Sequence, residues 1–253
     1  MAVEFLLLGN IEVFAFDTPI PLPSTMVRGL LATLLLRPNQ FVPAETIHRR
    51  LWFTEPASAA SNLRTYVTTL RRAIPDTAGG SRLTGRRRHG YRLTVDPGEC
   101  DLPLFHSAAE EGRRYISTRQ FEKAIPPLEA ALGLWRGIAG EDIPQHGTLA
   151  PTFHALNESH LNTIEGYAEA RLAMGHARHL IPDLRIHLTD QPLRERACAL
   201  LMEALCRVGD PAGAMQAYEH LRAALDRDLK IEPQNSLSRL RDMIAADNLD
   251  VLR

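Results

Sequence analysis

Hydrogen-bond donors gather on one face of a helical pattern that covers about residues 57–74 of this 253-residue chain. Apolar side chains at helical spacing define the opposite, inward face: Leu63, Val67, Leu70 and Ile74. The outer face carries amide, hydroxyl and guanidinium groups, on Ser61, Asn62, Arg64, Thr65, Thr68, Thr69, Arg71 and Arg72. Arginine and asparagine bind guanine and adenine edges through paired hydrogen bonds, and threonine contacts phosphates or thymine methyls. The pattern therefore predicts a helix that reads the major groove of DNA.

A second group of cations follows between two β-rich runs, residues 82–84 and 91–95. The connecting segment reads Gly-Arg-Arg-Arg-His-Gly, with Arg86, Arg87 and Arg88 at its centre. Arginine suits phosphates and the minor groove because its planar guanidinium is weakly hydrated and binds in a forked geometry. We expect this tip to touch DNA beside the helix.

The competing interpretation of these charges is an ordinary solvated helix surface. Such surfaces usually mix acidic and basic residues in pairs one turn apart. Between residues 57 and 75 the chain has no acidic residue. The absence favours a nucleic-acid-binding face.

The surrounding elements are those needed to hold such a helix and tip. Short β-rich runs cover residues 3–8 and 11–16, and residues 17–23 are expected to form a turn followed by an edge strand. Helical patterns then begin near Ser24 or Thr25, at Ala44 and at about Ala57. Three helices followed by a β-hairpin predict a winged helix-turn-helix of α+β class in residues 1–98.

Charge divides the chain in the same place. Residues 1–98 hold twelve arginines, no lysine and seven acidic residues, a net +5, whereas residues 99–253 carry a net −6. No basic leader, apolar stretch of 18 residues or cysteine framework is present in the sequence. We expect a cytoplasmic protein without a membrane segment, whose basic part meets DNA.

The carboxy-terminal part, residues 99–253, has a mainly helical pattern that repeats. Gly175 and Gly209 are 34 residues apart, and so are Leu184 and Tyr218. This period is typical of tetratricopeptide (TPR) helix pairs. A related unit around residues 112–131 is displaced by 56 residues, which predicts an insertion near residues 137–151. A last helix, about residues 233–246, is expected to cap this TPR-like array.

Both parts resemble one family. The segments LLGNIEV, RGLLATLLL, ETIHRRLW, EPASAASNLRTYVTTLRRAI and HGYRLTV are similar to the DNA-binding domain of antibiotic-regulatory (SARP) transcriptional activators of actinomycetes. The stretch PLRERACALLMEALCRVGDPAGAMQAYEHLRAALDRDLKIEP resembles their bacterial transcriptional activation domain. The resemblance covers the chain in order, although basic residues common near the start of the family's first helix are replaced by Thr25 and Met26.

The resemblance implies roles for the residues above. Base contacts fall on Asn62, Arg64, Thr65 and Thr69, and phosphate or groove-edge contacts on Ser61, Thr68, Arg71 and Arg72. The wing contact falls on Arg87, flanked by Arg86 and Arg88. It also implies double-stranded promoter DNA with direct repeats, a homodimer on that DNA, RNA polymerase holoenzyme as partner, and control of a secondary-metabolite gene cluster.

Other chemistry finds little support. The chain has no phosphate-binding Gly-x-x-x-x-Gly-Lys-Ser/Thr loop and no His-Glu-x-x-His motif, and Cys198 and Cys206 share the face of apolar residues. We therefore expect no enzyme, no metal and no cofactor. Two alternatives stay open: a helical-repeat adaptor whose winged helix binds protein, and a regulator that takes a small molecule in its helical part.

Overall fold

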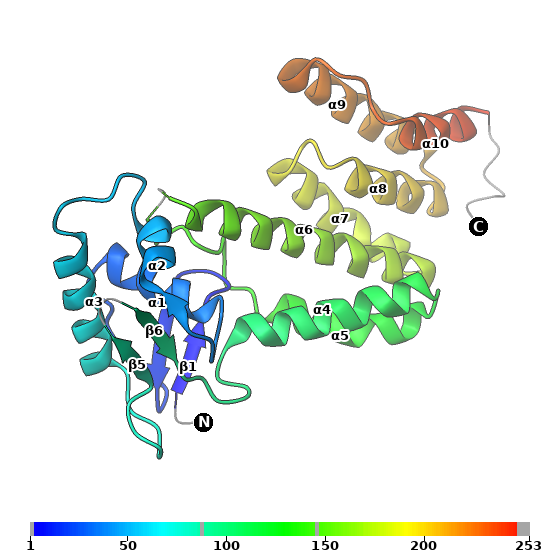
Figure 1. Ribbon diagram of the computed structural model, residues 1–253. Coiled ribbons are helices and arrows are strands. Elements are labelled where there is room, and N and C mark those ends of the chain that lie inside the picture. The colour runs from blue at the N-terminus through cyan, green and yellow to red at the C-terminus, as the bar shows by residue number, and fades with distance from the viewer. Residues whose placement is uncertain (1–2, 87–88, 145–146, 247–253) are drawn as a thin grey trace. The chain divides into compact units, whose positions relative to one another are not determined.

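The computed structural model describes residues 3–86, 89–144 and 147–246, and helices dominate it (Figure 1). The chain divides into two compact units, each built from two segments. The first comprises residues 1–109 and 130–161, and the second comprises residues 110–129 and 162–253. Within the described residues, no helix is both long and apolar enough to cross a membrane.

Among its described residues, the first unit contains two small antiparallel sheets, three complete helices and parts of three longer ones. One sheet has the order β1-β2-β3 and the other β4-β6-β5. The strands are β1 (Val3–Leu6), β2 (Glu12–Ala15), β3 (Thr18–Pro19), β4 (Val42–Pro43), β5 (Leu83–Arg86) and β6 (Gly90–Leu93). The complete helices are α1 (Thr25–Leu35), α2 (Ala44–Leu51) and α3 (Ala59–Ala73). This order of elements confirms the predicted winged helix-turn-helix.

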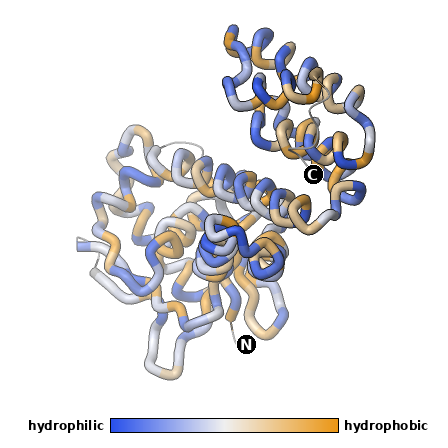
Figure 2. The backbone as a smooth tube through the Cα atoms, turned by 90° about the vertical axis from the view of Figure 1, so that its right-hand side faces the viewer, coloured by the Kyte–Doolittle hydropathy of each residue, from blue (hydrophilic) through white to orange (hydrophobic). Residues whose placement is uncertain are grey.

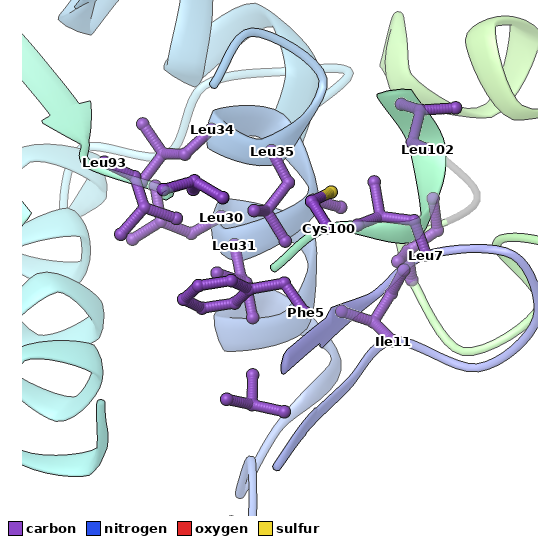
Figure 3. Packing of buried hydrophobic residues seen from close by; sticks show 14 of the residues in the cluster. Phe5, Leu7, Ile11, Leu30, Leu31, Leu34, Leu35, Leu93, Cys100 and Leu102 are labelled. Atoms are coloured by element: carbon purple, nitrogen blue, oxygen red, sulfur yellow. The ribbon is translucent and has the colours of Figure 1, made fainter. Parts of the chain in front are cut away.

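Helix α1 is the centre of the first core. Ser24 caps it by accepting the backbone N–H of Val27, and most of its side chains are buried. Figure 3 shows its leucines packed against Phe5 of β1 and Leu93 of β6, so α1 joins the two sheets. A core that encloses one helix on several sides explains the nearly continuous apolar sequence of α1.

The first unit extends beyond the boundary predicted at residues 98 and 99. The carboxylate of Asp101 accepts the backbone N–H groups of Leu7 and Leu8 at 2.8–2.9 Å. Asp142 accepts the N–H of Ile11 at 3.1 Å and pairs with Arg28 at 2.9 Å. These contacts tie the start of α4 (Asp101–Ser117) and the segment after α5 (Phe121–Gly133) to the amino-terminal elements, so the compact unit is larger than the sequence division.

The second unit consists of antiparallel helix pairs. Its helices are the later part of α4 (Asp101–Ser117), most of α5 (Phe121–Gly133), the end of α6 (Leu149–Ala173), α7 (Ala177–Asp190), α8 (Glu195–Arg207), α9 (Pro211–Leu229) and α10 (Asn235–Ala245). Gly175 and Gly209 occupy the turns after α6 and α8, with φ of 83° and 84°. Arg119, 56 residues before Gly175, has φ of 56° in the turn before α5. The predicted TPR-like repeat is therefore confirmed.

Apolar stripes on these helices form the second core. Figure 2 shows hydrophobic and hydrophilic residues alternating along each helix of the array. Leu180, Leu184, Ala214 and Tyr218, the repeat positions, are all buried. Helix α10 adds Leu237, Leu240 and Ile244 to the same cluster and closes the array.

Candidate nucleic-acid interface

Helix α3 presents the predicted donor face to solvent. Leu63, Val67 and Leu70 are buried on its inner side, and the helix packs against α1. This confirms the helical phase expected from the sequence. A helix of 15 residues is about 22 Å long, which is enough to lie along the floor of a major groove.

An aromatic cluster joins the end of α2 to the middle of α3. Trp52, the residue after α2, stacks on Tyr66 of α3 with ring centroids 6.4 Å apart, and His48 meets Trp52 edge-on at 5.5 Å. Glu55 lies in the turn between the helices, and its carboxylate contacts His48 Nδ1 at 2.6 Å. The acid nearest to the start of α3 is thus engaged by α2.

The hydroxyl-bearing residues of α3 bond to their own helix. Thr65, Thr68 and Thr69 each donate to the carbonyl four residues earlier, at 3.3, 2.9 and 3.0 Å. Ser61 donates to the carbonyl of Ser58 at 2.8 Å. The threonines therefore offer methyl groups and oxygen lone pairs to a ligand, while their hydroxyl protons are engaged.

Three predicted residues carry the strongest donors on this face. Asn62 is half-buried, and its amide donates to the Ser58 hydroxyl at 3.2 Å, a bond easily exchanged for a base edge. Arg64 and Arg72 are exposed, and within the described residues neither guanidinium has a hydrogen bond or an ion pair. The two guanidinium groups are available for an external anion or base.

Arg71 differs from its neighbours because it joins α3 to the hairpin. Its Nε donates to the carbonyl of Leu83 in β5 at 2.9 Å, and its guanidinium lies 6.0 Å from the centre of the Tyr91 ring. Burial raises the pKa of the Tyr91 hydroxyl, although the charges of Arg71 and Arg64 oppose that shift. Arg71 thus has a structural role in addition to any contact with phosphate.

The hairpin β5–β6 forms the base of the wing. Gly85 and Gly90 have φ of 135° and 138°, and a Cβ on Gly90 would lie 2.1 Å from the carbonyl oxygen of Val42. The backbone of Arg86 ends β5, opposite Gly90. Arg87 and Arg88, the other predicted wing residues, lie outside the described residues. The structure therefore describes the base of the wing.

Arg92 was not among the predicted contacts, yet it occupies the hairpin's exposed face. It pairs across the ladder with Thr84, whereas the neighbouring Tyr91 and Leu93 are buried. Alternation along a strand places every second side chain on one face, and that period was the available signal. Arg92 adds a cation to the same hairpin as Arg86.

Other arginines of the first unit serve the fold. Arg82 is buried and makes a two-pronged pair with Glu99, with both N–O distances 2.7 Å. Arg50 donates to the carbonyl of Thr33 at 3.1 Å, and Arg28 pairs with Asp142. Because these arginines are paired within the fold, fewer arginines of the unit remain free to contact a ligand. Prominent among the free ones are those on the outer face of α3. No cluster of three potential metal ligands occurs in the residues that the structure describes.

Comparison with known proteins agrees with this architecture. Residues 17–93 match the family model described as "Transcriptional regulatory protein, C terminal", and residues 100–245 match the "Bacterial transcriptional activator domain". The chain belongs to the SARP family of transcriptional regulators. The order of its two family domains is the order expected from the sequence.

Individual relatives show how far the likeness of this SARP regulator extends. The transcriptional regulatory protein MoaR1 of Mycobacterium tuberculosis is 34% identical over 242 residues, which are 94% of this chain and 78% of MoaR1. The regulatory protein DnrI of Streptomyces peucetius is 33% identical over 90% of this chain and 85% of its own. The solved structure of Mycobacterium tuberculosis EmbR superposes with a TM-score of 0.86 and 29% identity, covering 97% of this chain and 65% of that one.

Proposed function

We propose that this SARP regulator binds promoter DNA in a sequence-specific manner and activates transcription from the bound site. Helix α3 enters the major groove, where Asn62, Arg64, Thr65 and Thr69 meet base edges. Ser61, Thr68, Arg71 and Arg72 lie along the phosphates, and the wing with Arg86, Arg87 and Arg88 reaches the neighbouring groove. The regulator acts in the cytoplasm and controls a secondary-metabolite gene cluster.

One observation carries the DNA-binding proposal: the outer face of α3 is free of acids and holds two uncommitted guanidinium groups. Arg64 and Arg72 are exposed and without partners within the described part of the chain. A protein-binding adaptor has no need of a cationic face without acids, whereas DNA has a phosphate about every 1.7 Å of its axis.

We further propose that two protomers bind direct repeats and contact RNA polymerase holoenzyme. Direct repeats place the protomers head to tail, so their contact does not close on a two-fold axis. The family membership supports this arrangement. Gel-shift titration of DNA with one or two half-sites tests it, and equal affinity per site for both DNAs would argue against paired protomers.

The DNA proposal is tested by titrating the full chain with DNA upstream of its own gene and with a scrambled sequence, across a range of salt. Affinity for the first DNA should exceed that for the second and fall steeply with salt, because each phosphate contact releases condensed counterions. If no upstream DNA is bound in a salt-dependent way, the proposal fails and the adaptor hypothesis gains.

Single variants separate the recognition of base sequence from the electrostatic attraction to any DNA. Arg64→Ala or Asn62→Ala should reduce the preference for the site over scrambled DNA by about 1–3 kcal/mol. Arg87→Ala should weaken both DNAs alike and lower the salt slope by about 1. Arg113→Ala, an exposed arginine of α4, serves as the control and should change neither. Full discrimination in Arg64→Ala and Asn62→Ala would contradict the assigned helix face.

A further inference from the structure

The second unit contains a cleft that the DNA proposal does not use. It measures about 480 Å³ and lies among α7, α8 and α9, the helices coloured yellow to orange in Figure 1. Its floor comes mainly from α8 and is apolar, formed by Cys198, Leu201, Leu205 and Leu221. Clefts of a few hundred Å³ with an apolar floor are the usual size and character of small-molecule sites.

Polar groups line the walls of this cleft on two facing helices. Arg185 and Thr189 come from α7, and Gln216 and His220 come from α9. Arg185 is exposed, and its guanidinium makes no hydrogen bond or ion pair with the residues that the structure describes. Arg222 of α9, by contrast, pairs with Glu219 at 2.8 Å.

The charge of the lining contrasts with that of its surroundings. The second unit has 16 basic and 18 acidic residues, yet no acidic residue belongs to the described lining of this cleft. A second hollow of the same unit, about 600 Å³, is lined by three glutamates (Glu165, Glu195 and Glu203) and two arginines (Arg194 and Arg196). The cleft among α7, α8 and α9 is therefore complementary to an anion with an apolar body.

We propose that this cleft binds a small apolar molecule that carries one anionic group, such as a carboxylate or sulfonate. The apolar body rests on Leu201, Leu205 and Leu221, and the anion meets the Arg185 guanidinium with Gln216 and His220 as further donors. A forked guanidinium favours an anion of this kind over a neutral group of the same shape. A ligand held between α7 and α9 stabilises the helical unit by RT ln(1 + c/Kd), where c is the free ligand concentration.

The binding is reversible, because the cysteine in the floor is a poor nucleophile. Cys198 is buried, its Sγ approaches the carbonyl of Ala217 at 3.6 Å, and burial raises the pKa of its thiol to about 12. The thiolate is the reactive form, and it is scarce at neutral pH. The side chain contributes an apolar surface.

Two fluorescent probes test the proposal on the full chain. The first is 8-anilinonaphthalene-1-sulfonate, and the second is N-phenyl-1-naphthylamine, which has the same rings without the sulfonate. The sulfonate probe should bind the wild-type chain at one saturable site and should raise the melting temperature of the chain. Arg185→Gln should lower the affinity for the sulfonate probe about tenfold and change the affinity for the neutral probe by less than about twofold. Arg178→Gln, an exposed arginine of α7 outside the cleft lining, is the matched control.

Filling the cleft provides the second arm of the test. Ala217→Phe should abolish binding of both probes, and Gln216→Phe, at an exposed position, provides the same block if Ala217→Phe lowers the helical melting temperature. Loss of sulfonate binding in Arg185→Gln but not in Arg178→Gln supports the proposal. No saturable binding, equal loss in both arginine variants, or binding that survives the filled cleft would overturn it. None of these readouts involves DNA, so this test and the DNA test fail separately.

Discussion

Replacing Asp101 should destabilise the first unit although the residue lies outside the winged-helix sequence. The residue is 4% exposed, and its carboxylate accepts the N–H groups of Leu7 and Leu8. In Asp101→Ala both buried donors lose their partner, and each unsatisfied donor costs about 1–3 kcal/mol. We therefore expect a loss of roughly 2–6 kcal/mol, a large part of the 5–15 kcal/mol that holds a typical domain.

The two tryptophans make this loss measurable in the full chain. Trp52 and Trp135 both pack against the core of the first unit, so their fluorescence in a urea titration follows that unit. Circular dichroism includes the helices of both units and follows the array as well. The tryptophan transition of Asp101→Ala should move to a lower urea concentration. Asp101→Asn should lower the free energy of unfolding by a smaller amount, about 1–3 kcal/mol, because its amide oxygen retains one acceptor.

The control for this prediction is Asp76→Ala, which removes an exposed carboxylate from the same unit. It should change stability by less than about 0.5 kcal/mol. If Asp101→Ala and Asp76→Ala unfold at the same urea concentration, the hydrogen bonds to Leu7 and Leu8 do not stabilise the unit.

Two further predictions concern a buried charge and the wing. Burial raises the pKa of Glu165, but His187 and Arg194 outweigh it and hold the pKa below its ordinary 4.5. The ionised Glu165 therefore stabilises the second unit above pH 4.5, and this stabilisation is lost as pH falls through the folded-state pKa. The melting temperature measured by circular dichroism should drop in that range, and the drop should be smaller in Glu165→Gln. Gly90→Ala should destabilise the first unit by about 1–3 kcal/mol, because a residue with a Cβ is strained at the φ of 138° that Gly90 adopts. Gly79→Ala is the control and should not destabilise the unit, because the nearest atom lies 3.7 Å from the new Cβ. If both variants show the same tryptophan transition, Gly90 is not required to be glycine.

Local sequence patterns predicted most of the elements correctly. Apolar spacing placed Leu63, Val67 and Leu70 inside, and the 34-residue offset placed Gly175 and Gly209 in equivalent turns. Both signals are periodic and depend on neighbours along the chain. A helix phase or a repeat can be predicted whenever one face is buried regularly.

The contacts that complete the first unit could not be predicted in this way. Asp101 binds N–H groups 93 and 94 residues earlier, and Asp142 binds one that is 131 residues earlier. An aspartate at a helix start or in a loop has the same local signature whether it faces solvent or caps a distant strand. The predicted DNA face is subject to the same limit, since Arg71 could not be distinguished from Arg72 until the position of Leu83 was known.

The folded units also change the meaning of the charge division. Residues 1–98 carry a net +5, but the compact first unit, which adds residues 99–109 and 130–161, has 13 basic and 12 acidic residues. The added acids include Glu99 and Asp142, which neutralise Arg82 and Arg28 inside the fold. The proposed attraction to DNA therefore cannot rest on the unit's total charge of +1. It rests on position, because the neutralising acids lie among structural arginines whereas α3 has no acidic residue, and a few well-placed guanidinium groups produce a local field. For the proposed function, this arrangement favours reading a site over indiscriminate binding along the duplex.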